Sequence, residues 1–475
     1  MNIKKFQLKV RNPRTGQYDY NINILSPHQV KEECDALRSY QQQWFYAGID
    51  ARINALQQWK AAVEKNKQQL INAICIDTGR KWETVLEVDL VASSINRWCA
   101  IAKEIFIEPT QKKSSVPFIQ LQQSLIPFQL VGVISPWNFP LLLSLIDTIP
   151  ALLAGCTVIV KPSEITPRFI KVLQQTIDDV PALKTCLQYV EGDGSVGAEL
   201  VNNCDLICFT GSTDTGKKVY DAASKKMIPV FLELGGKDPA VVLEGAHLES
   251  ATSAVLWGST ANAGQSCLSI ERVYVQQTIY DAFIKLLVEK TKNVHIAYPS
   301  MDSGVIAPII FEKQVYIINE HLRDAIEKGA TILCGAAQCE EHGGGYYLPP
   351  TVLINVNHEM KIMREETFGP VIPVMQFNTK EEAIALANGT VYGLSGAVFA
   401  KTNEEAIAFA SKLDCGAVSI NDAALTAVMH EGEKNSFKLS GIGGTRMGPS
   451  AIKRFMRQKV FIIKDAEVKS PWWYS

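Results

Sequence analysis

Short apolar runs alternate with helical patterns through the middle of the chain. Each run is bounded by turn residues, and the segments between the runs carry apolar residues at helical spacing. Strands separated by helices in this way indicate βαβ units and a parallel sheet. The expected strands are 156–160, 187–190, 206–210, 230–232 and 240–243, with helices over 166–179 and 196–202.

A second alternation of the same kind begins near residue 250. It predicts a second α/β domain after the first. The expected helices are 249–263, 280–293, 313–328, 380–388 and 403–412, and the expected strands are 273–275, 331–333 and 371–375. Residues 28–76 precede both alternations and predict solvated amphipathic helices, because their helical periodicity is combined with many Gln, Lys and Glu residues.

Two further apolar stretches are strand-like. Residues 116–133 contain Pro117 and Pro127, which indicates an edge strand or hairpin. The run 460–464 lies near the C-terminus and needs a pairing partner in this chain or in another copy. Residues 141–160 are the most membrane-like stretch, but Asp147 and Pro150 interrupt it. A buried helix followed by a buried strand is the expectation there, without a membrane span.

Composition narrows the class of protein. The chain has 475 residues, of which 47% are hydrophobic and 20% charged, which excludes a disordered, collagenous or coiled-coil protein. Lys and Arg number 47 against 49 Asp and Glu, so the basic excess of nucleic-acid binders is absent. The 11 cysteines form no CxxC motif and indicate reduced thiols, hence a cytoplasmic protein. No signal peptide and no metal site are expected.

Two motifs follow predicted strands in the first alternation. In VGVISPWNFP, Pro136 and Pro140 bracket Asn138, whose amide can donate to an oxyanion or can simply cap the next helix. In VKPSE, Lys161 and Glu164 can hold a ribose diol or can form a solvated helix start. The carboxyl ends of parallel strands are where ligands bind, which favours the functional interpretations.

Two glycine-rich turns come next. Gly192, Gly194 and Gly197 satisfy G-x-G-x-x-G literally, but that motif is weak when it stands alone. The turn FTGSTDTG contains Ser212 and lies between a strand and a helix, where backbone amides can bind pyrophosphate. Either turn can also be a tight connection between a strand and a helix that binds no ligand.

The last two motifs carry candidate reactive groups. In ELGGKDP, Glu233 ends a predicted strand and can act as a general base, or it can form a salt bridge with Lys237. In ANAGQSCL, Cys267 lies among small residues at a turn, where an accessible thiol is a plausible nucleophile. The other cysteines are expected to pack in the core.

Taken in order, PWNFP, VKPSE, FTGST, ELGGK, a Gly-Gln-x-Cys turn and EETFGP resemble the NAD(P)-dependent aldehyde dehydrogenase superfamily. The resemblance covers about residues 35 to 465. It implies that Cys267 attacks the aldehyde as a thiolate, while the Asn138 side chain and the Cys267 backbone N–H hold the oxyanion. Glu233 then activates water to hydrolyse a thioester. A non-catalytic binding or structural protein on the same fold is the alternative from another class, and a coenzyme A-acylating enzyme is an alternative within the fold.

The resemblance also implies the cofactor site. Lys161 and Glu164 resemble the adenosine ribose contacts, and Glu164 favours NAD, with NADP as an alternative. Gly211 and Ser212 resemble the pyrophosphate turn, and Glu366 and Phe368 the nicotinamide contacts. The remaining cofactor positions implied are Ile134, Pro136, Trp137, Ser163, Gly194 and Thr215.

The expected substrate is an apolar aldehyde. Phe139, Leu142, Leu143 and Ile146 are spaced i, i+3, i+4, i+7 and share one helix face, which in the family walls the aldehyde tunnel. Trp257 and Leu268 are expected to add to it. Long-chain, aromatic or terpenoid (apocarotenoid) aldehydes fit such a tunnel. Core packing is the alternative role for this face, and a semialdehyde such as succinic semialdehyde is the alternative substrate.

That alternative is disfavoured by one helix segment. Relatives acting on carboxylated semialdehydes often have Thr-Arg-Lys where this chain has Leu145-Ile146-Asp147. The loop HEGEKNSFKLSG, from His430, also departs from the Gly-Gly-Tyr-Lys pattern of many relatives. That loop shapes the tunnel entrance in the family.

The expected architecture has three parts. A Rossmann-like NAD-binding domain comprises 1–114 and 134–233, an α/β catalytic domain comprises 234–445, and a small β oligomerisation element comprises 115–133 and 446–475. The resemblance suggests a homodimer or homotetramer.

Overall fold

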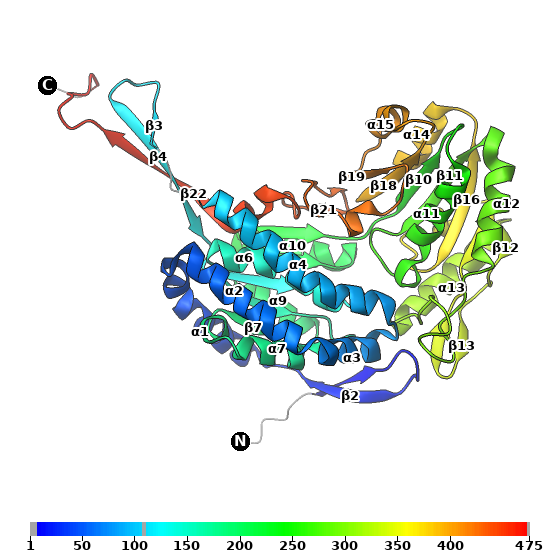
Figure 1. Cartoon of the computed structure of the whole chain (residues 1–475), viewed down its shortest axis with the longest axis horizontal. Helices are drawn as coiled ribbons and strands as arrows, with labels where there is room; N and C mark the ends of the chain where they lie inside the picture. The colour runs from blue at the N-terminus through cyan, green and yellow to red at the C-terminus, as the bar shows by residue number, and fades with distance from the viewer. Residues whose placement is uncertain (1–6, 107–110, 473–475) are drawn as a thin grey trace.

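The computed structural model describes residues 7–106 and 111–472. Two α/β lobes lie side by side, each built on its own sheet, and a long β-arm projects from the first (Figure 1). An N-terminal hairpin, β1 (Gln7–Arg11) with β2 (Tyr18–Asn23), lies at the edge of the molecule. The α/β class with a Rossmann-like first lobe is confirmed.

The first lobe contains a six-stranded sheet with the order β21-β9-β8-β5-β6-β7. Four of its parallel strands, β6 to β9, are predicted apolar runs, whereas β5 lies mostly within the stretch 116–133 that was expected to form an edge strand or hairpin. The short β21 pairs antiparallel with β9 at the edge. Helices cover both faces, which explains why the inner strands are apolar along their whole length. The strands are β5 (Leu130–Ile134), β6 (Thr157–Lys161), β7 (Leu187–Tyr189), β8 (Leu206–Thr210), β9 (Val230–Glu233) and β21 (Gly441–Ile442).

The helices of this lobe include the predicted solvated region. A capping box formed by Ser26 and Gln29 starts α1, since each side chain satisfies a backbone N–H of the other residue. The side chains of Trp59 and Trp98 are buried between the helices, and Trp59 Nε1 donates to Thr176 Oγ1 at 2.9 Å. The helices are α1 (Pro27–Tyr46), α2 (Gly48–Lys65), α3 (Lys67–Thr78), α4 (Trp82–Ile105), α7 (Phe169–Asp178), α8 (Pro181–Lys184), α9 (Gly194–Asn203) and α10 (Thr213–Lys226).

The membrane-like stretch forms two short helices instead of one. They are α5 (Pro140–Leu145) and α6 (Thr148–Ala154), and Asp147 separates them. The buried Asp147 carboxylate forms ion pairs with Arg446 and Arg454. The break between α5 and α6 therefore lies at a buried charged residue. Among the described residues, no helix combines the length and the hydropathy needed to cross a membrane.

The second lobe contains a seven-stranded sheet with the order β12-β15-β16-β11-β10-β18-β19. All neighbours are parallel except β12 and β15. The predicted strands 273–275, 331–333 and 371–375 and the five predicted helices are present, and the run 240–243, expected with the first alternation, forms β10 in this sheet. Three strands were not predicted: β15 (Thr351–Ile354), β18 (Ser395–Phe399) and β19 (Ala417–Ile420). The others are β10 (Asp238–Val242), β11 (Ile270–Gln276), β12 (Thr331–Cys334) and β16 (Val371–Phe377), with α11 (Leu248–Thr260), α12 (Tyr280–Thr291), α13 (Glu312–Glu327), α14 (Lys380–Asn388) and α15 (Asn403–Ala410).

The arm consists of β3 (Lys112–Lys113), β4 (Ile119–Pro127) and β22 (Met456–Lys464), with β4 between the other two. It is shorter than the expected ranges 115–133 and 446–475. Residues 130–133 belong to β5, inside the first sheet, and the 3-10 helix Pro449–Phe455 packs in the first core. β21, expected within the catalytic domain, also pairs in the first sheet. Near residue 128 apolar residues lie on both sides of the junction, so the sequence gave no sign of the change from arm to sheet.

One connection between the lobes positions the candidate site. β9 ends at Glu233 in the first sheet, and β10 begins at Asp238 in the second. Only the residues 234–237 lie between them, so the ELGGKDP motif crosses from one lobe to the other. The carboxyl end of β9 therefore faces the second lobe.

Candidate active site

Cys267 lies on a strained turn between α11 and β11. Asn262, Ala263 and Gly264 all have φ between 53° and 70°, the left-handed region that L side chains rarely adopt. At Gly264 a Cβ would come within 2.2 Å of the Gly369 carbonyl oxygen, so the turn requires glycine there. Strain of this kind persists only where the surroundings hold it, and it is common at functional sites.

The sulfur lies where two cavities meet. Cys267 and Glu233 line both a largely apolar cavity and a narrower cleft. Burial raises the pKa of the Cys267 thiol to about 12, the nearby Glu366 carboxylate adds to the rise, and the charge of Lys434 opposes it. The thiol form is therefore the resting form, and it has to lose its proton before it can attack.

The Asn138 side chain is buried and points toward this turn. Its Nδ2 donates to the Gln265 carbonyl at 3.0 Å, which leaves its second N–H without a partner among the described residues. It does not cap α5, because Phe139 occupies the N-cap position and no side chain caps the helix there. An amide N–H beside the sulfur is suited to an oxyanion.

A buried network that sequence reasoning missed holds Asn138 in place. Arg80 donates to the Asn138 carbonyl at 2.8 Å, and the Asn262 amide donates to the same oxygen at 3.2 Å. Glu87 accepts from Arg80 at 2.8 Å and also from the backbone N–H groups of Leu141 and Leu142. The start of α5 is thereby fixed to α4. No short motif marks Arg80 or Glu87, since both act through contacts far along the chain.

Glu233 does not form the alternative salt bridge with Lys237. The Lys237 ammonium instead binds Glu271 at 2.5 Å and Thr367 at 3.0 Å, in a fully buried cluster. Glu233 Oε2 accepts a 2.7 Å hydrogen bond from Ser436 Oγ. Ser436 lies in the loop from His430 whose departure from the family pattern the sequence showed, but its contact with Glu233 was not foreseen.

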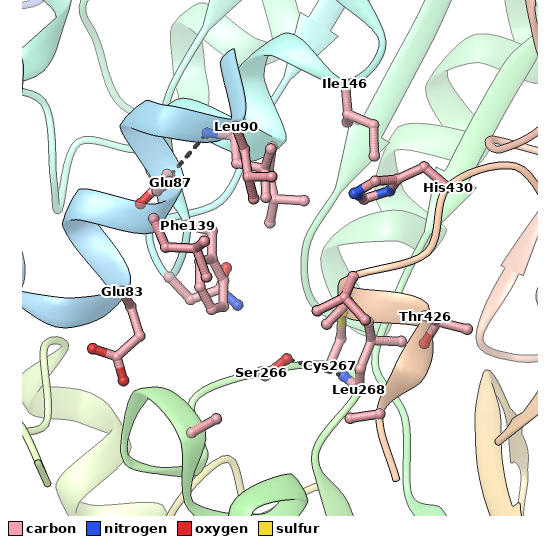
Figure 2. Close-up of a pocket in the computed structure, with 18 of the residues that line it drawn as sticks. Glu83, Glu87, Leu90, Phe139, Ile146, Ser266, Cys267, Leu268, Thr426 and His430 are labelled. Carbon is pink, nitrogen blue, oxygen red and sulfur yellow. Dashed lines mark hydrogen bonds between the residues drawn. The ribbon is translucent and has the colours of Figure 1, made fainter. Parts of the chain in front are cut away.

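The apolar cavity brings together the predicted substrate residues. Figure 2 shows Phe139 and Leu90 on one side of it and Cys267 and Leu268 on the other. Thr426 and His430 close it from the chain segment after β19. All six predicted residues line this cavity: Phe139, Leu142, Leu143, Ile146, Trp257 and Leu268. The wall from α4 was missed: Trp82, Leu86 and Leu90.

The narrower cleft brings together half of the predicted cofactor residues. Its lining includes Pro136, Trp137, Gly211, Ser212, Glu366 and Phe368, and Gln314 was not predicted. The Trp137 and Phe368 rings meet edge to face with centroids 5.4 Å apart. Burial raises the pKa of Glu366 to about 8, aided by the negative charge of Glu271.

The other predicted cofactor residues lie outside the cleft that reaches Cys267. Lys161 Nζ and Glu164 Oε2 form a 2.9 Å ion pair just beyond β6. Thr215 lies in the first turn of α10, where its N–H donates to Ser212 Oγ. Gly194 starts α9, and the side chains of Ile134 and Ser163 are buried beside the sheet. Their place at the carboxyl ends of β5–β8 is consistent with an extended ligand.

A model of the aldehyde dehydrogenase family matches residues 2–461. The chain belongs to this family. The solved structure of PutA from Anabaena variabilis is 54% identical, covers 99% of this chain and 100% of its own, and superposes with a TM-score of 0.97. Lactaldehyde dehydrogenase from Escherichia coli is 30% identical over 98% of this chain and 97% of its own, with a TM-score of 0.92.

Another relative is named for a different aldehyde from lactaldehyde. The 4,4'-diapolycopene aldehyde oxidase of Methylomonas sp is 34% identical over 91% of this chain and 81% of its own length. The names of these aldehyde dehydrogenase relatives therefore include small polar and long apolar aldehydes. Membership in the family supports aldehyde oxidation and leaves the substrate to be argued from the cavity.

Proposed function

We propose that this protein oxidises apolar aldehydes to carboxylic acids with NAD, through a thioester on Cys267. The observation that carries the proposal is the place of the sulfur, between an apolar cavity that can hold a hydrocarbon and a more polar cleft that can hold a nicotinamide. Long-chain, aromatic or terpenoid aldehydes are the substrate class that these walls favour.

The first step is addition of the sulfur to the carbonyl carbon. The thiol loses its proton to solvent, and the positive charge of Lys434 favours the thiolate that remains. The thiolate then forms a C–S bond, and the carbonyl π electrons move to the oxygen. The free N–H of Asn138 and the backbone N–H of Cys267 stabilise that oxyanion, because both are held in place before the reaction starts.

The residues of the cleft fit a nicotinamide dinucleotide. Ser212 caps α10, so the positive end of a helix dipole reaches the cleft wall and suits a pyrophosphate. Gly235 leaves room beside Glu366, since a Cβ there would lie 2.7 Å from the carboxylate. Glu164, paired with Lys161, supplies a carboxylate for a ribose diol and favours NAD over NADP. When bound, the nicotinamide accepts the hydride that converts the thiohemiacetal into a thioester.

Hydrolysis completes the reaction. Glu233 takes a proton from water as the water oxygen attacks the thioester carbon, and the C–S bond breaks to release the acid and the thiolate. A base in this place favours hydrolysis over transfer to coenzyme A. It also argues against a non-catalytic protein, because the nucleophile, the oxyanion donor and the base all line the same space.

A kcat/KM series tests the substrate class. Alkanals of increasing length, benzaldehydes, apocarotenals and succinic semialdehyde would be compared with NAD and NADP. We expect kcat/KM to rise with apolar length and to be higher with NAD. Lys434 and His430 also line the cavity, so a preference for succinic semialdehyde is the competing result and would contradict the apolar assignment.

A second test addresses the catalytic groups. Cys267→Ala should not reduce NAD with any aldehyde, and Glu233→Gln should give a burst of NADH near one equivalent followed by slow turnover. Coenzyme A should yield no acyl-CoA. Steady turnover by Cys267→Ala would overturn the mechanism.

We also propose that the arm joins copies of the chain into a homodimer or homotetramer. Val460, Phe461 and Ile462 of β22 are exposed on the projecting arm, where a pairing strand would cover them. A cytoplasmic location is proposed as well, because all 11 cysteines are free thiols.

A further inference from the structure

Glu271 is a buried acid near the start of an apolar strand. It lies in β11, shortly after Cys267 in the sequence, and is only 3% exposed. Acidic side chains are almost never fully buried unless they are paired. The carboxylate of Glu271 accepts from three donors, which come from two other parts of the chain. It takes no part in the proposed reaction steps, so its place in the fold needs another reason.

The two oxygens of the Glu271 carboxylate hold the backbone of the segment that follows Glu366. Oε2 accepts from the Thr367 N–H and Oε1 accepts from the Phe368 N–H, both at 2.8 Å. Oε2 also binds the Lys237 ammonium at 2.5 Å. One oxygen would be enough to neutralise Lys237. Because the other oxygen binds the Phe368 N–H, the carboxylate also fixes the direction of this backbone.

The same buried cluster fixes the rest of Thr367. Its hydroxyl accepts from Lys237 Nζ at 3.0 Å and lies 3.1 Å from His321 Nδ1. The Thr367 carbonyl accepts from Gln314 Nε2 at 2.8 Å. The side chains of Thr367, Lys237 and His321 are buried. Thr367 is therefore held through its N–H, its hydroxyl and its carbonyl.

Phe368 needs such an anchor because its backbone is strained. Its φ is 53°, in the left-handed region that a residue with a side chain rarely adopts. A conformation of this kind persists only where the surroundings hold it. The side chains of Phe368 and Glu366 line the cleft, and the Phe368 ring meets the ring of Trp137 there. The N–H group of Phe368 is bound instead by Glu271, outside the lining of the cleft.

We propose that Glu271 is a positioning residue for the cofactor. It holds the backbone of residues 367–368 so that the Glu366 and Phe368 side chains face the nicotinamide and its ribose. This inference rests on the proposed function, because it requires the nicotinamide in the cleft. Since Glu271 lies on the strand that follows Cys267, a single strand of the second lobe supports both the nucleophile and the cofactor segment.

The charge of Glu271 gives this role a signature that packing alone does not have. Burial raises the pKa of Glu366 to about 8, and the negative charge of Glu271 adds to the rise. An ionised Glu366 attracts the positive nicotinamide ring, so NAD should bind more tightly as the pH rises through about 8. The titratable groups that face Glu366 are Glu271, Lys237, Asp238, Cys267 and Tyr392.

Calorimetric titration with NAD, in the absence of aldehyde, tests both the contact and the charge. The proteins compared are the wild type, Glu271→Gln and the double variant Glu271→Gln/Lys237→Met. We expect Kd for NAD to rise by about tenfold in both variants, as when a hydrogen bond to a charged group is lost. In Glu271→Gln the pH at which binding tightens should fall below about 8, because a negative charge near Glu366 is gone. In the double variant it should return toward the wild-type value, since both charges are removed and no buried cation is left unpaired.

Asp324→Asn is the matched control. Asp324 also accepts a backbone N–H, from Lys361 at 2.8 Å, and pairs with Lys328 at 2.7 Å, but it does not line the cleft. This variant should leave Kd and its pH dependence unchanged. Kd values within about threefold of the wild type in both Glu271 variants, or a rise in Kd that is equal at every pH in Glu271→Gln, would overturn the positioning role and leave the proposed function intact. A wild type that does not bind NAD would contradict the proposed function itself.

Discussion

Ser436 Oγ donates a 2.7 Å hydrogen bond to Glu233 Oε2, across 203 residues of sequence. It joins the loop that closes the apolar cavity to the end of β9, where the proposed base is located. Lys434, two residues earlier on the same loop, lines the cavity with Cys267. A single short segment therefore contacts the base and contributes charge near the nucleophile.

Removing this hydrogen bond should impair hydrolysis of the thioester more than its formation. A hydrogen bond to a charged group contributes about 1.5–3 kcal/mol, so we expect Ser436→Ala to lower kcat by about tenfold or somewhat more. The NADH burst should persist in rapid-mixing experiments while the steady rate falls. Ser436→Thr keeps the hydroxyl and should recover most of the rate. If Ser436→Ala lowered the burst rate and the steady rate by the same factor relative to the wild type, Ser436 would not act by positioning Glu233 for hydrolysis.

Asn138 should contribute to the transition state and little to substrate affinity. Loss of one oxyanion donor reduces kcat by about 10²- to 10³-fold. We expect Asn138→Ala to show that decrease with KM changed by less than about threefold. Asn138→Asp is the matched comparison, since its carboxylate repels the oxyanion and should be at least as inactive. A KM effect larger than the kcat effect would contradict the assignment.

The ionisation of Cys267 should respond in opposite directions to two neighbours. The negative charge of Glu366 raises the pKa of the thiol, whereas the positive charge of Lys434 lowers it. Glu366→Gln should therefore shift the pH dependence of iodoacetamide alkylation to lower pH, and Lys434→Met should shift it to higher pH. The alkylation rates of both variants would be followed by mass spectrometry in the absence of cofactor. Shifts in the same direction would rule out a charge effect.

The buried cluster at the bend between α5 and α6 should be important for stability. Asp147 is 2% exposed, and its carboxylate is bound by Arg446 at 2.6 Å and by Arg454. Asp147→Ala leaves the buried Arg446 and Arg454 without their shared carboxylate, and we expect it to lower the free energy of unfolding by about 3–5 kcal/mol. Urea denaturation would measure the change. The exposed pair of Lys31 and Asp35 is the control, and Asp35→Ala should cost less than about 1 kcal/mol.

The strands and the motif residues were predictable because their signals are local. An apolar run between turns marks β6 or β8 without knowledge of the rest of the chain, and the motif residues follow directly after such runs. Glu233 and Cys267 were each indicated by a short motif of their own, ELGGKDP and ANAGQSCL. The same logic indicated the face of α5 that lines the cavity.

The missed residues act through contacts that no local signal reports. Arg80 lies in the connection between α3 and α4, and Glu87 lies in α4. Arg80 meets Asn138, and Glu87 meets Leu141 and Leu142, only after α4 packs against α5. The boundary of the arm was wrong for a related reason. Apolar residues lie on both sides of residue 128, so the sequence shows no boundary there. The Phe128 N–H donates to the Phe455 carbonyl, and the chain passes there from the arm into the sheet.

Because the chain crosses between the lobes in the four residues between β9 and β10, Glu233 and Cys267 are held by different sheets. Glu233 is anchored in the six-stranded sheet, while Cys267 directly precedes a strand of the seven-stranded sheet. Their separation is therefore set by the mutual orientation of two lobes and not by the packing of either one. A small rocking of one lobe against the other would bring base and sulfur together or draw them apart, which makes the rate of turnover sensitive to substitutions at the lobe boundary that touch neither side chain.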